Sequence, residues 1–92
     1  MSLHKIAEIE FDPEKDAKNE EKHRLSLGDF AGFDSDPVVV EDDRQDYGEP
    51  RFRAFGLIDG KPHSTAFTVR GNAMRLISFR RARAKELRRY ER

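Results

Sequence analysis

The residues in this sequence best suited to chemistry are a histidine beside a lysine and a group of arginines towards the C-terminus. Lys22 and His23 are adjacent, and histidine is the side chain whose ordinary pKa suits proton transfer near neutral pH. Cleavage of RNA at its own 2′-hydroxyl needs a base for that proton, an acid for the leaving oxygen and fixed cations around the phosphorus. Arginine is the cation best shaped for phosphate oxygens. We therefore predict a metal-independent phosphodiester site. Its predicted catalytic residues are His23, Lys22, Arg75, Arg80 and Glu49.

Further polar residues are predicted to bind RNA or to support the catalytic groups. The RNA-binding set is basic and comprises Lys15, Arg51, Arg53, Arg81 and Arg83. The supporting set comprises Asn19, Glu86 and Tyr90. His23 also has a second interpretation, as a helix-end histidine that interacts with the negative end of the helix dipole. The residues alone leave both interpretations of His23 open.

No metal site or cofactor site is predicted. The chain has no cysteine, and its three histidines, His4, His23 and His63, are too scattered to suggest a zinc site. The acidic stretch at residues 41–50 does not have the spacing of a calcium loop. Neither a Ser-His-Asp arrangement nor a glycine-rich phosphate loop can be recognised in the sequence.

The charges are divided between the two halves of the chain, although the formal net charge is zero. Residues 1–50 hold six basic and fifteen acidic side chains, whereas residues 51–92 hold twelve basic and three acidic ones. The halves could neutralise each other in the fold, or the basic half could form a surface for a phosphate backbone. No apolar run is long enough to span a bilayer, and no secretory signal pattern opens the chain. Together with the lack of cysteine, these features favour a cytoplasmic protein.

The first element expected to position the candidate residues is a polar helix. Residues 5–11 alternate loosely and predict a strand before it. Asp12 and Pro13 favour a helix start, because aspartate caps free N–H groups and proline fits the first turn, so a helix is expected over residues 14–24. Four of its residues fall within about 100° of arc, namely Lys15, Asn19, Lys22 and His23. This polar stripe is either a solvated face or a face turned inward to line a site.

The rest of the chain predicts a second short helix, a set of strands and a closing helix. Ser26 can cap the short helix, whose buried side would be Leu27, Phe30 and Phe33. Strands are expected at residues 38–40, 51–58, 62–69 and 74–79, with a hairpin turn at Asp59-Gly60 and with Arg75, Ile77 and Phe79 on one face of the last strand. We therefore predict one α+β domain over residues 1–92. In it an N-terminal strand and two helices pack on an antiparallel four-stranded meander, and a C-terminal helix closes the fold.

Several short motifs, taken in order, resemble one protein family. They are Phe11-Asp12-Pro13-x-Lys15-x-x-x-Asn19-x-x-Lys22-His23, Asp36-Pro37, Asp46-Tyr47-Gly48-Glu49-x-Arg51, Gly56-x-Ile58-Asp59-Gly60, Phe67-Thr68-x-Arg70-Gly71 and Arg75-x-Ile77-Ser78-x-Arg80-Arg81-Ala82-x-x-x-Glu86-x-x-x-Tyr90. The chain resembles the BrnT toxins of type II toxin–antitoxin systems, which are relatives of RelE-like ribonucleases. The resemblance covers nearly the whole chain, and the order and spacing of the motifs make it specific.

The resemblance implies a RelE-like fold and a small toxin that cleaves RNA and stops translation. It also implies a partner, a BrnA-like antitoxin with a ribbon-helix-helix domain, through which the complex binds DNA and represses its own operon. The toxin itself would contact DNA only indirectly and would have no membrane partner. Because the polar stripe coincides with the first family motif, the resemblance favours a stripe that faces the sheet or the cleft beside it.

The sequence departs from the family pattern at three positions. Arg24 stands where glycine is common, so the usual left-handed stop of the first helix is expected to be missing. Phe79 is larger than the usual residue and is expected to narrow the cleft beside Arg80. Arg83 stands at the expected N-cap of the last helix, so Glu86 lacks a capping-box partner and that helix is expected to start late or to pack loosely.

A second hypothesis is a non-catalytic binding module, in which the basic C-terminal helix only docks the antitoxin for repressor assembly. Direct DNA binding by that helix is a third hypothesis. It is less favoured, because no second helix stands at the spacing of a helix-turn-helix.

Overall fold

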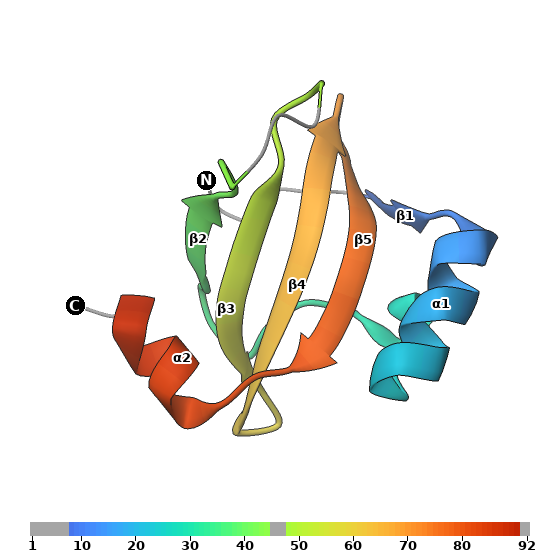
Figure 1. Ribbon diagram of the computed structural model, residues 1–92. Coiled ribbons are helices and arrows are strands. Elements are labelled where there is room, and N and C mark those ends of the chain that lie inside the picture. Colours follow the sequence, from blue (N-terminus) through green and yellow to red (C-terminus); the bar gives the residue numbers. More distant parts are fainter. Residues whose placement is uncertain (1–7, 45–47, 91–92) are drawn as a thin grey trace.

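The computed structural model describes residues 8–44 and 48–90, without the side chain of Tyr90. These residues form a five-stranded sheet in the order β1-β5-β4-β3-β2 (Figure 1). The strands are β1 (Glu8–Phe11), β2 (Val38–Glu41), β3 (Phe52–Ile58), β4 (Lys61–Arg70) and β5 (Ala73–Arg81). The helices are α1 (Pro13–His23) and α2 (Ala84–Tyr90), and a 3-10 turn, η2 (Leu27–Asp29), lies between α1 and β2. α1 packs beside β5, and α2 packs against β3.

The predicted architecture was wrong in its sheet and in its helices. β1 is an edge strand of the sheet and runs parallel to β5, with Glu8 opposite Ala73 and Phe11 opposite Leu76. The predicted meander did not include this strand. With β1 added, the sheet is five-stranded and mixed instead of four-stranded and antiparallel. Pairing between two segments so far apart in the chain has no local pattern by which a sequence could reveal it. Residues 5–7 of the predicted first strand lie outside the described residues.

α1 begins and ends through identifiable local interactions. The Asp12 side chain accepts a hydrogen bond of 2.8 Å from the Glu14 N–H, and Pro13 occupies the first turn. At the other end Arg24 adopts the left-handed conformation, with φ of 59°, and its N–H donates to the Glu20 carbonyl at 2.8 Å. The expectation that the left-handed stop is missing was therefore wrong. Arginine adopts the glycine-like conformation at a cost of about 1–2 kcal/mol.

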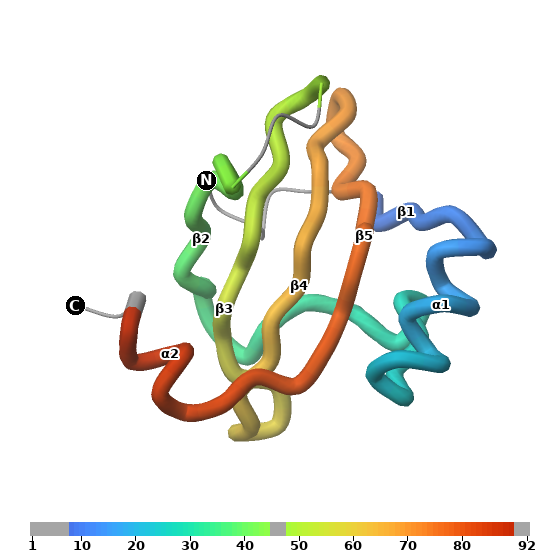
Figure 2. The backbone as a smooth tube through the Cα atoms, in the orientation of Figure 1, coloured from blue at the N-terminus to red at the C-terminus, as the bar shows by residue number. Residues whose placement is uncertain are grey.

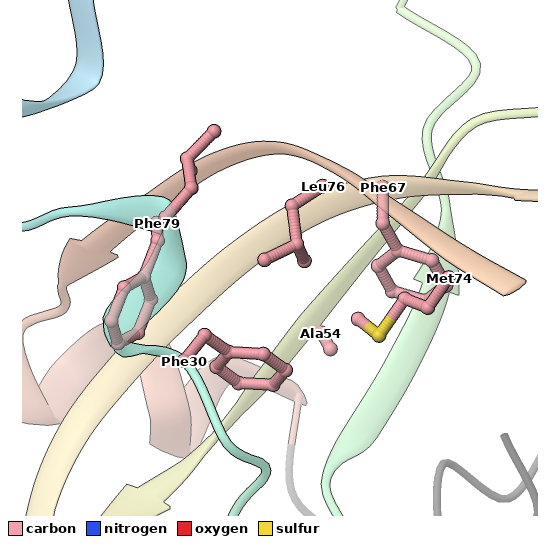
Figure 3. Close-up of a cluster of buried hydrophobic side chains, with 7 residues drawn as sticks. Phe30, Ala54, Phe67, Met74, Leu76 and Phe79 are labelled. Carbon is pink, nitrogen blue, oxygen red and sulfur yellow. The ribbon is translucent and has the colours of Figure 1, made fainter. Parts of the chain in front are cut away.

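A bulge in β5 decides which of its side chains face the core. Leu76 pairs with Phe67 and Ser78 with Ala66, so Ile77 is an extra residue without a partner across the ladder. The extra residue shifts the alternation, and Met74, Leu76 and Phe79 all reach the core (Figure 3). The predicted face shared by Arg75, Ile77 and Phe79 was therefore wrong. Phe79 packs against Phe30 with ring centroids 5.3 Å apart, so its ring fills the core instead of narrowing a cleft.

The predicted second helix is a single 3-10 turn. The Ser26 hydroxyl accepts from the Gly28 N–H at 3.1 Å and caps η2 as expected, but the helix does not continue beyond Asp29. Leu27 and Phe30 are buried in the core. In Figure 2 the tube from α1 to β2 crosses one face of the sheet, which is the face that carries the core residues.

α2 covers part of the opposite face. Leu87 of α2 and Phe55 of β3 are both buried, yet neither belongs to the main core. Arg53 lies on the same face as Phe55, with its guanidinium carbon 5.6 Å from the ring centroid. Period-two alternation beyond the bulge also assigns Ser78 and Arg80 to this face. Neither described helix has the length and apolar character needed to cross a membrane.

Candidate active site

A pocket of about 380 Å³ lies between α1 and β5. Its lining is mostly polar and consists of Asp12, Glu14, Lys15, Lys18, Asn19, Lys22, His23, Ile77 and Ser78. Every member of the predicted polar stripe is in this set, so the stripe lines a pocket. Lys15 and Lys22 are exposed, His23 is half-buried and Asn19 is buried against the sheet.

Asn19 fixes the position of α1 relative to β5. Its Nδ2 donates to the Phe79 carbonyl at 2.8 Å and to the Leu25 carbonyl at 2.7 Å, and its Oδ1 accepts from the Phe79 N–H at 2.9 Å. β1 pairs with β5 only as far as Leu76, so within the described part of the chain the outer edge of β5 at Phe79 has no strand beside it. The Asn19 amide takes the place of a neighbouring peptide group there. The residue predicted to support catalysis therefore holds the wall of the pocket together.

His23 lies at the end of α1 with its charge state biased towards neutral. Partial burial is the largest cause of its lowered pKa, and the positive charges of Lys22 and Arg80 lower the pKa further. Arg80 does not line the pocket, but its charge reaches His23. A histidine with a lowered pKa is largely uncharged at pH 7 and can accept a proton.

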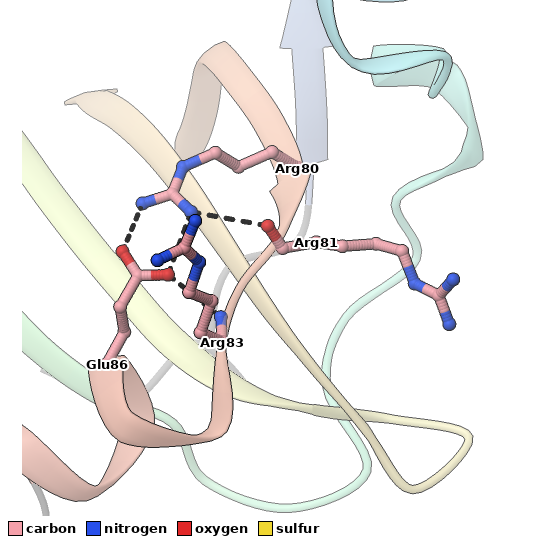
Figure 4. Close-up of polar contacts among 4 residues, drawn as sticks. All are labelled: Arg80, Arg81, Arg83 and Glu86. Atoms are coloured by element: carbon pink, nitrogen blue, oxygen red, sulfur yellow. Dashed lines mark hydrogen bonds and ion pairs between the residues drawn. The ribbon is translucent and has the colours of Figure 1, made fainter.

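Arg80 is held by Glu86 of α2 through a two-pronged ion pair (Figure 4). The two N–H···O distances are 2.9 and 3.1 Å. The same carboxylate accepts from the Arg83 backbone N–H at 2.8 Å, which is the reach-back half of a capping box. The expectation of a late helix start was wrong, because α2 begins at Ala84, directly after Arg83. The hydrogen bond from Arg80, and then that from Arg83, lowers the pKa of Glu86 to about 2.

Glu86→Gln is expected to remove a pH-dependent part of the stability. The pKa of Glu86 falls from 4.5 to about 2 on folding, so the ionised carboxylate stabilises the fold fully above pH 4.5. That contribution disappears as the pH falls towards 2. The side chains of Arg80 and Glu86 are 32% and 30% exposed, and solvent screening limits the effect to about 1 kcal/mol. Urea unfolding at several pH values measures it, with exposed Glu21→Gln as the control. Identical acid sensitivity in wild type and Glu86→Gln would contradict the assignment.

Some predicted catalytic residues lie away from the pocket. Arg75 pairs with Glu10 across β1 and β5 at 3.4 Å, and Glu49 pairs with Arg70 at 3.1 Å. Neither Arg75 nor Glu49 lines the pocket. Arg51 directly precedes β3, near the end of the sheet where Phe52 pairs with Phe67, whereas Arg80 pairs with Ser64 towards the other end.

The remaining predicted residues have separate positions. Arg53 lies in the middle of β3, and Arg83 stands directly before α2. Arg81 lines a second pocket, and in Figure 4 its guanidinium points away from the Arg80–Glu86 pair. The side chain of Tyr90 lies outside the described residues, as do Asp46 and Tyr47 of the third motif.

Several residues at the site were missed by sequence reasoning. Asp16 accepts from the Leu27 N–H at 2.7 Å and from the Ser26 hydroxyl at 3.0 Å, and so ties α1 to η2. Its helical spacing of three from Asn19 was the available signal. Lys18 and Ser78 line the pocket. Ser78 is part of the last family motif, which was the available signal, whereas no pattern in the sequence distinguishes Lys18 from other surface residues. Among the described residues no group of three or more histidine, cysteine or acidic side chains is arranged to hold a metal ion.

Comparison with known families agrees with the motif resemblance. Residues 11–86 match the family described as ribonuclease toxin, BrnT, of type II toxin–antitoxin system. No curated protein matches the chain. The matched segment contains α1, the pocket and the Arg80–Glu86 pair, and it spans most of the 92 residues. The chain therefore belongs to the BrnT family of ribonuclease toxins of type II toxin–antitoxin systems.

Proposed function

We propose that this toxin cleaves RNA without a metal ion and that His23 takes the proton from the attacking 2′-hydroxyl. The observation that carries the proposal is the environment of His23, which is half-buried in an open pocket beside Lys22 and within electrostatic reach of Arg80. These surroundings lower its pKa, so the neutral imidazole needed of a base is present at pH 7.

In this proposal cations around His23 stabilise the negative charge that grows on the phosphorus. Lys15 and Lys22 line the pocket, and Lys22 is the adjacent donor for the leaving 5′-oxygen. Arg80 uses two N–H groups on Glu86 and one on the Arg81 carbonyl. A guanidinium has five N–H groups, so about two remain for phosphate oxygens. Glu86 acts as a positioning residue that fixes the plane of this guanidinium.

The test is cleavage of a single-stranded RNA by the purified toxin in the presence of EDTA. Products ending in a 2′,3′-cyclic phosphate are expected, and a 2′-deoxynucleotide at the cut site should block the cut because the nucleophile is missing. Under subsaturating conditions the rate should fall steeply between about 50 and 200 mM salt, since phosphate contacts release counterions. Activity that EDTA abolishes and Mg²⁺ restores would refute metal independence. Intact RNA with normal antitoxin binding would favour the non-catalytic binding module.

In the cell the proposal implies a cytoplasmic toxin that stops translation by destroying RNA. Its antitoxin would be a BrnA-like protein with a ribbon-helix-helix domain, and DNA would be bound only through that partner. Family membership supports an antitoxin partner in general. Co-expression with the protein encoded beside it tests this part, because a true antitoxin should restore growth and co-purify with the toxin.

A further inference from the structure

We propose that a second pocket holds the base of a nucleotide one position beyond the two that flank the cleaved phosphate. This inference rests on the proposed ribonuclease function and names a subsite of the same active site. The pocket has a volume of about 290 Å³ and is lined by Leu25, Ile58, Asp59, Lys61, His63 and Arg81. It combines apolar walls with hydrogen-bonding groups and two cations, and a nucleotide offers the matching apolar ring faces, polar base edge and phosphate.

The second pocket adjoins the first. His23 lines the first pocket and Leu25 lines the second, and these residues are only two positions apart. Two residues of extended chain span at most about 7 Å, so the end of α1 is a wall shared by both pockets. Arg80 and Arg81 are consecutive but point in different directions: Arg80 is directed to Glu86, whereas Arg81 points away from that pair and lines the second pocket (Figure 4). A strand of RNA that leaves His23 can therefore pass over this wall into the second pocket.

His63 gives the second pocket a defined hydrogen-bonding group. It is only 7% exposed, and its Nδ1 lies 2.7 Å from the Lys61 carbonyl oxygen. A carbonyl oxygen only accepts hydrogen bonds, so Nδ1 carries the hydrogen and the Nε2 of the neutral ring is an acceptor. Among the described residues Nε2 has no hydrogen-bond partner. It is nevertheless not fully buried, because it is absent from the buried side-chain atoms that lack a partner. It is thus available to an N–H group on a base edge.

The second pocket is also held in shape before any ligand binds. The His63 ring stacks on Phe79 with centroids 5.6 Å apart. The Asp34 carboxylate accepts from the N–H groups of Asp59 and Gly60, each at 3.0 Å, and so fixes the β3–β4 hairpin. Preformed sites lose less entropy on binding, which suits recognition of a single base. Leu25 and Ile58, both half-buried, supply the apolar contact, and exposed Lys61 and Arg81 supply the charge.

The experiment compares the binding of short RNAs that cannot be cut, because the scissile position carries a 2′-deoxyribose. The probes are a dinucleotide and two trinucleotides, extended by one mixed-base nucleotide at the 5′ or the 3′ end. One trinucleotide should bind wild type about ten-fold more tightly than the dinucleotide, as expected for one seated base. His63→Asn retains a donor for the Lys61 carbonyl but removes Nε2, and Arg81→Ala removes one exposed cation. Each variant should lose most of the ten-fold advantage, which is the ratio of trinucleotide to dinucleotide affinity measured within the same variant.

Arg70→Ala is the matched control, because it also removes one positive charge but lies at the far end of the ten-residue strand β4. It should retain the trinucleotide advantage. The subsite is refuted if neither trinucleotide binds wild type more tightly than the dinucleotide does. It is also refuted if the trinucleotide advantage survives in both single variants, Arg81→Ala and a folded His63→Asn. Should His63→Asn not fold, Arg81→Ala alone decides between these outcomes. RNA cleavage by wild type is assayed separately. If wild type binds a trinucleotide more tightly than the dinucleotide but does not cleave RNA, only the catalytic proposal is refuted. If wild type cleaves RNA but shows no tighter trinucleotide binding, only the subsite is refuted.

Discussion

The double variant His23→Ala, Arg80→Ala is expected to abolish growth arrest on induction and to cut RNA at least 100-fold more slowly than wild type. Loss of a general base costs about 10²–10⁴-fold, and loss of a fixed charge at the developing oxyanion costs about 10²–10³-fold. Both side chains project from the surface of elements that other residues hold, and neither belongs to the core. The fold should therefore survive, which circular dichroism and antitoxin binding can check.

The single variants separate the two roles. Since His23 must be uncharged to accept a proton, activity of wild type should rise with pH through a midpoint below 6.5. Arg80→Ala removes one of the charges that lower the pKa of His23, so its residual activity should show a midpoint at higher pH. Arg89→Ala removes an exposed cation from α2 without these effects and is the control. Full toxicity in the folded double variant, or an unchanged pH profile in Arg80→Ala, would argue against this site.

The helical part of the site could be predicted from sequence because its causes are local. Asp12 and Pro13 determine where α1 begins, and a spacing of 100° per residue then brings Lys15, Lys22 and His23 to one side. The bulge at Ile77 could not be predicted, because it arises from the register between β4 and β5. It alone reverses the expected orientation of Phe79. The parallel pairing of β1 with β5 was missed for the same reason.

The ionic part of the site was predicted less well, because residue type does not reveal which partner a charge will find. Arg75 and Glu49 are as suitable chemically as Arg80 and Glu86. Arg75, however, pairs with Glu10 through the parallel pairing of β1 with β5, which was not predicted, and Glu49 pairs with Arg70. Of the ion pairs among the described residues, only the Arg80–Glu86 pair includes a charge, that of Arg80, that lowers the pKa of His23. The family motifs contain Arg75, Glu49, Arg80 and Glu86 alike, without distinguishing the residues that stabilise the sheet from those beside the pocket.

Asn19→Ala is expected to lower the free energy of unfolding by about 3 kcal/mol, because it removes three hydrogen bonds at a buried position and leaves the Phe79 N–H and carbonyl without partners. The cost should exceed that of most surface substitutions, and exposed Lys18→Ala on the same helix should change stability by less than about 0.5 kcal/mol. Urea denaturation at pH 7 measures both variants. Asn19→Asp is nearly isosteric but has no N–H to donate, so it should be at least as destabilising as Asn19→Ala.

The same substitution separates positioning from chemistry. Asn19 is a residue of α1, which also carries His23, and it bonds to β5, which carries Arg80. Its loss should therefore loosen the geometry of the two groups even where the protein remains folded. Cleavage by the folded fraction of Asn19→Ala should therefore fall. The rise of its activity with pH, which the surroundings of His23 set, should become broader without disappearing. A stability loss below about 1 kcal/mol would mean that water or another group satisfies the open edge of β5. In that case α1 would be held to the sheet by Asp16 and its contacts with Ser26 and Leu27 instead.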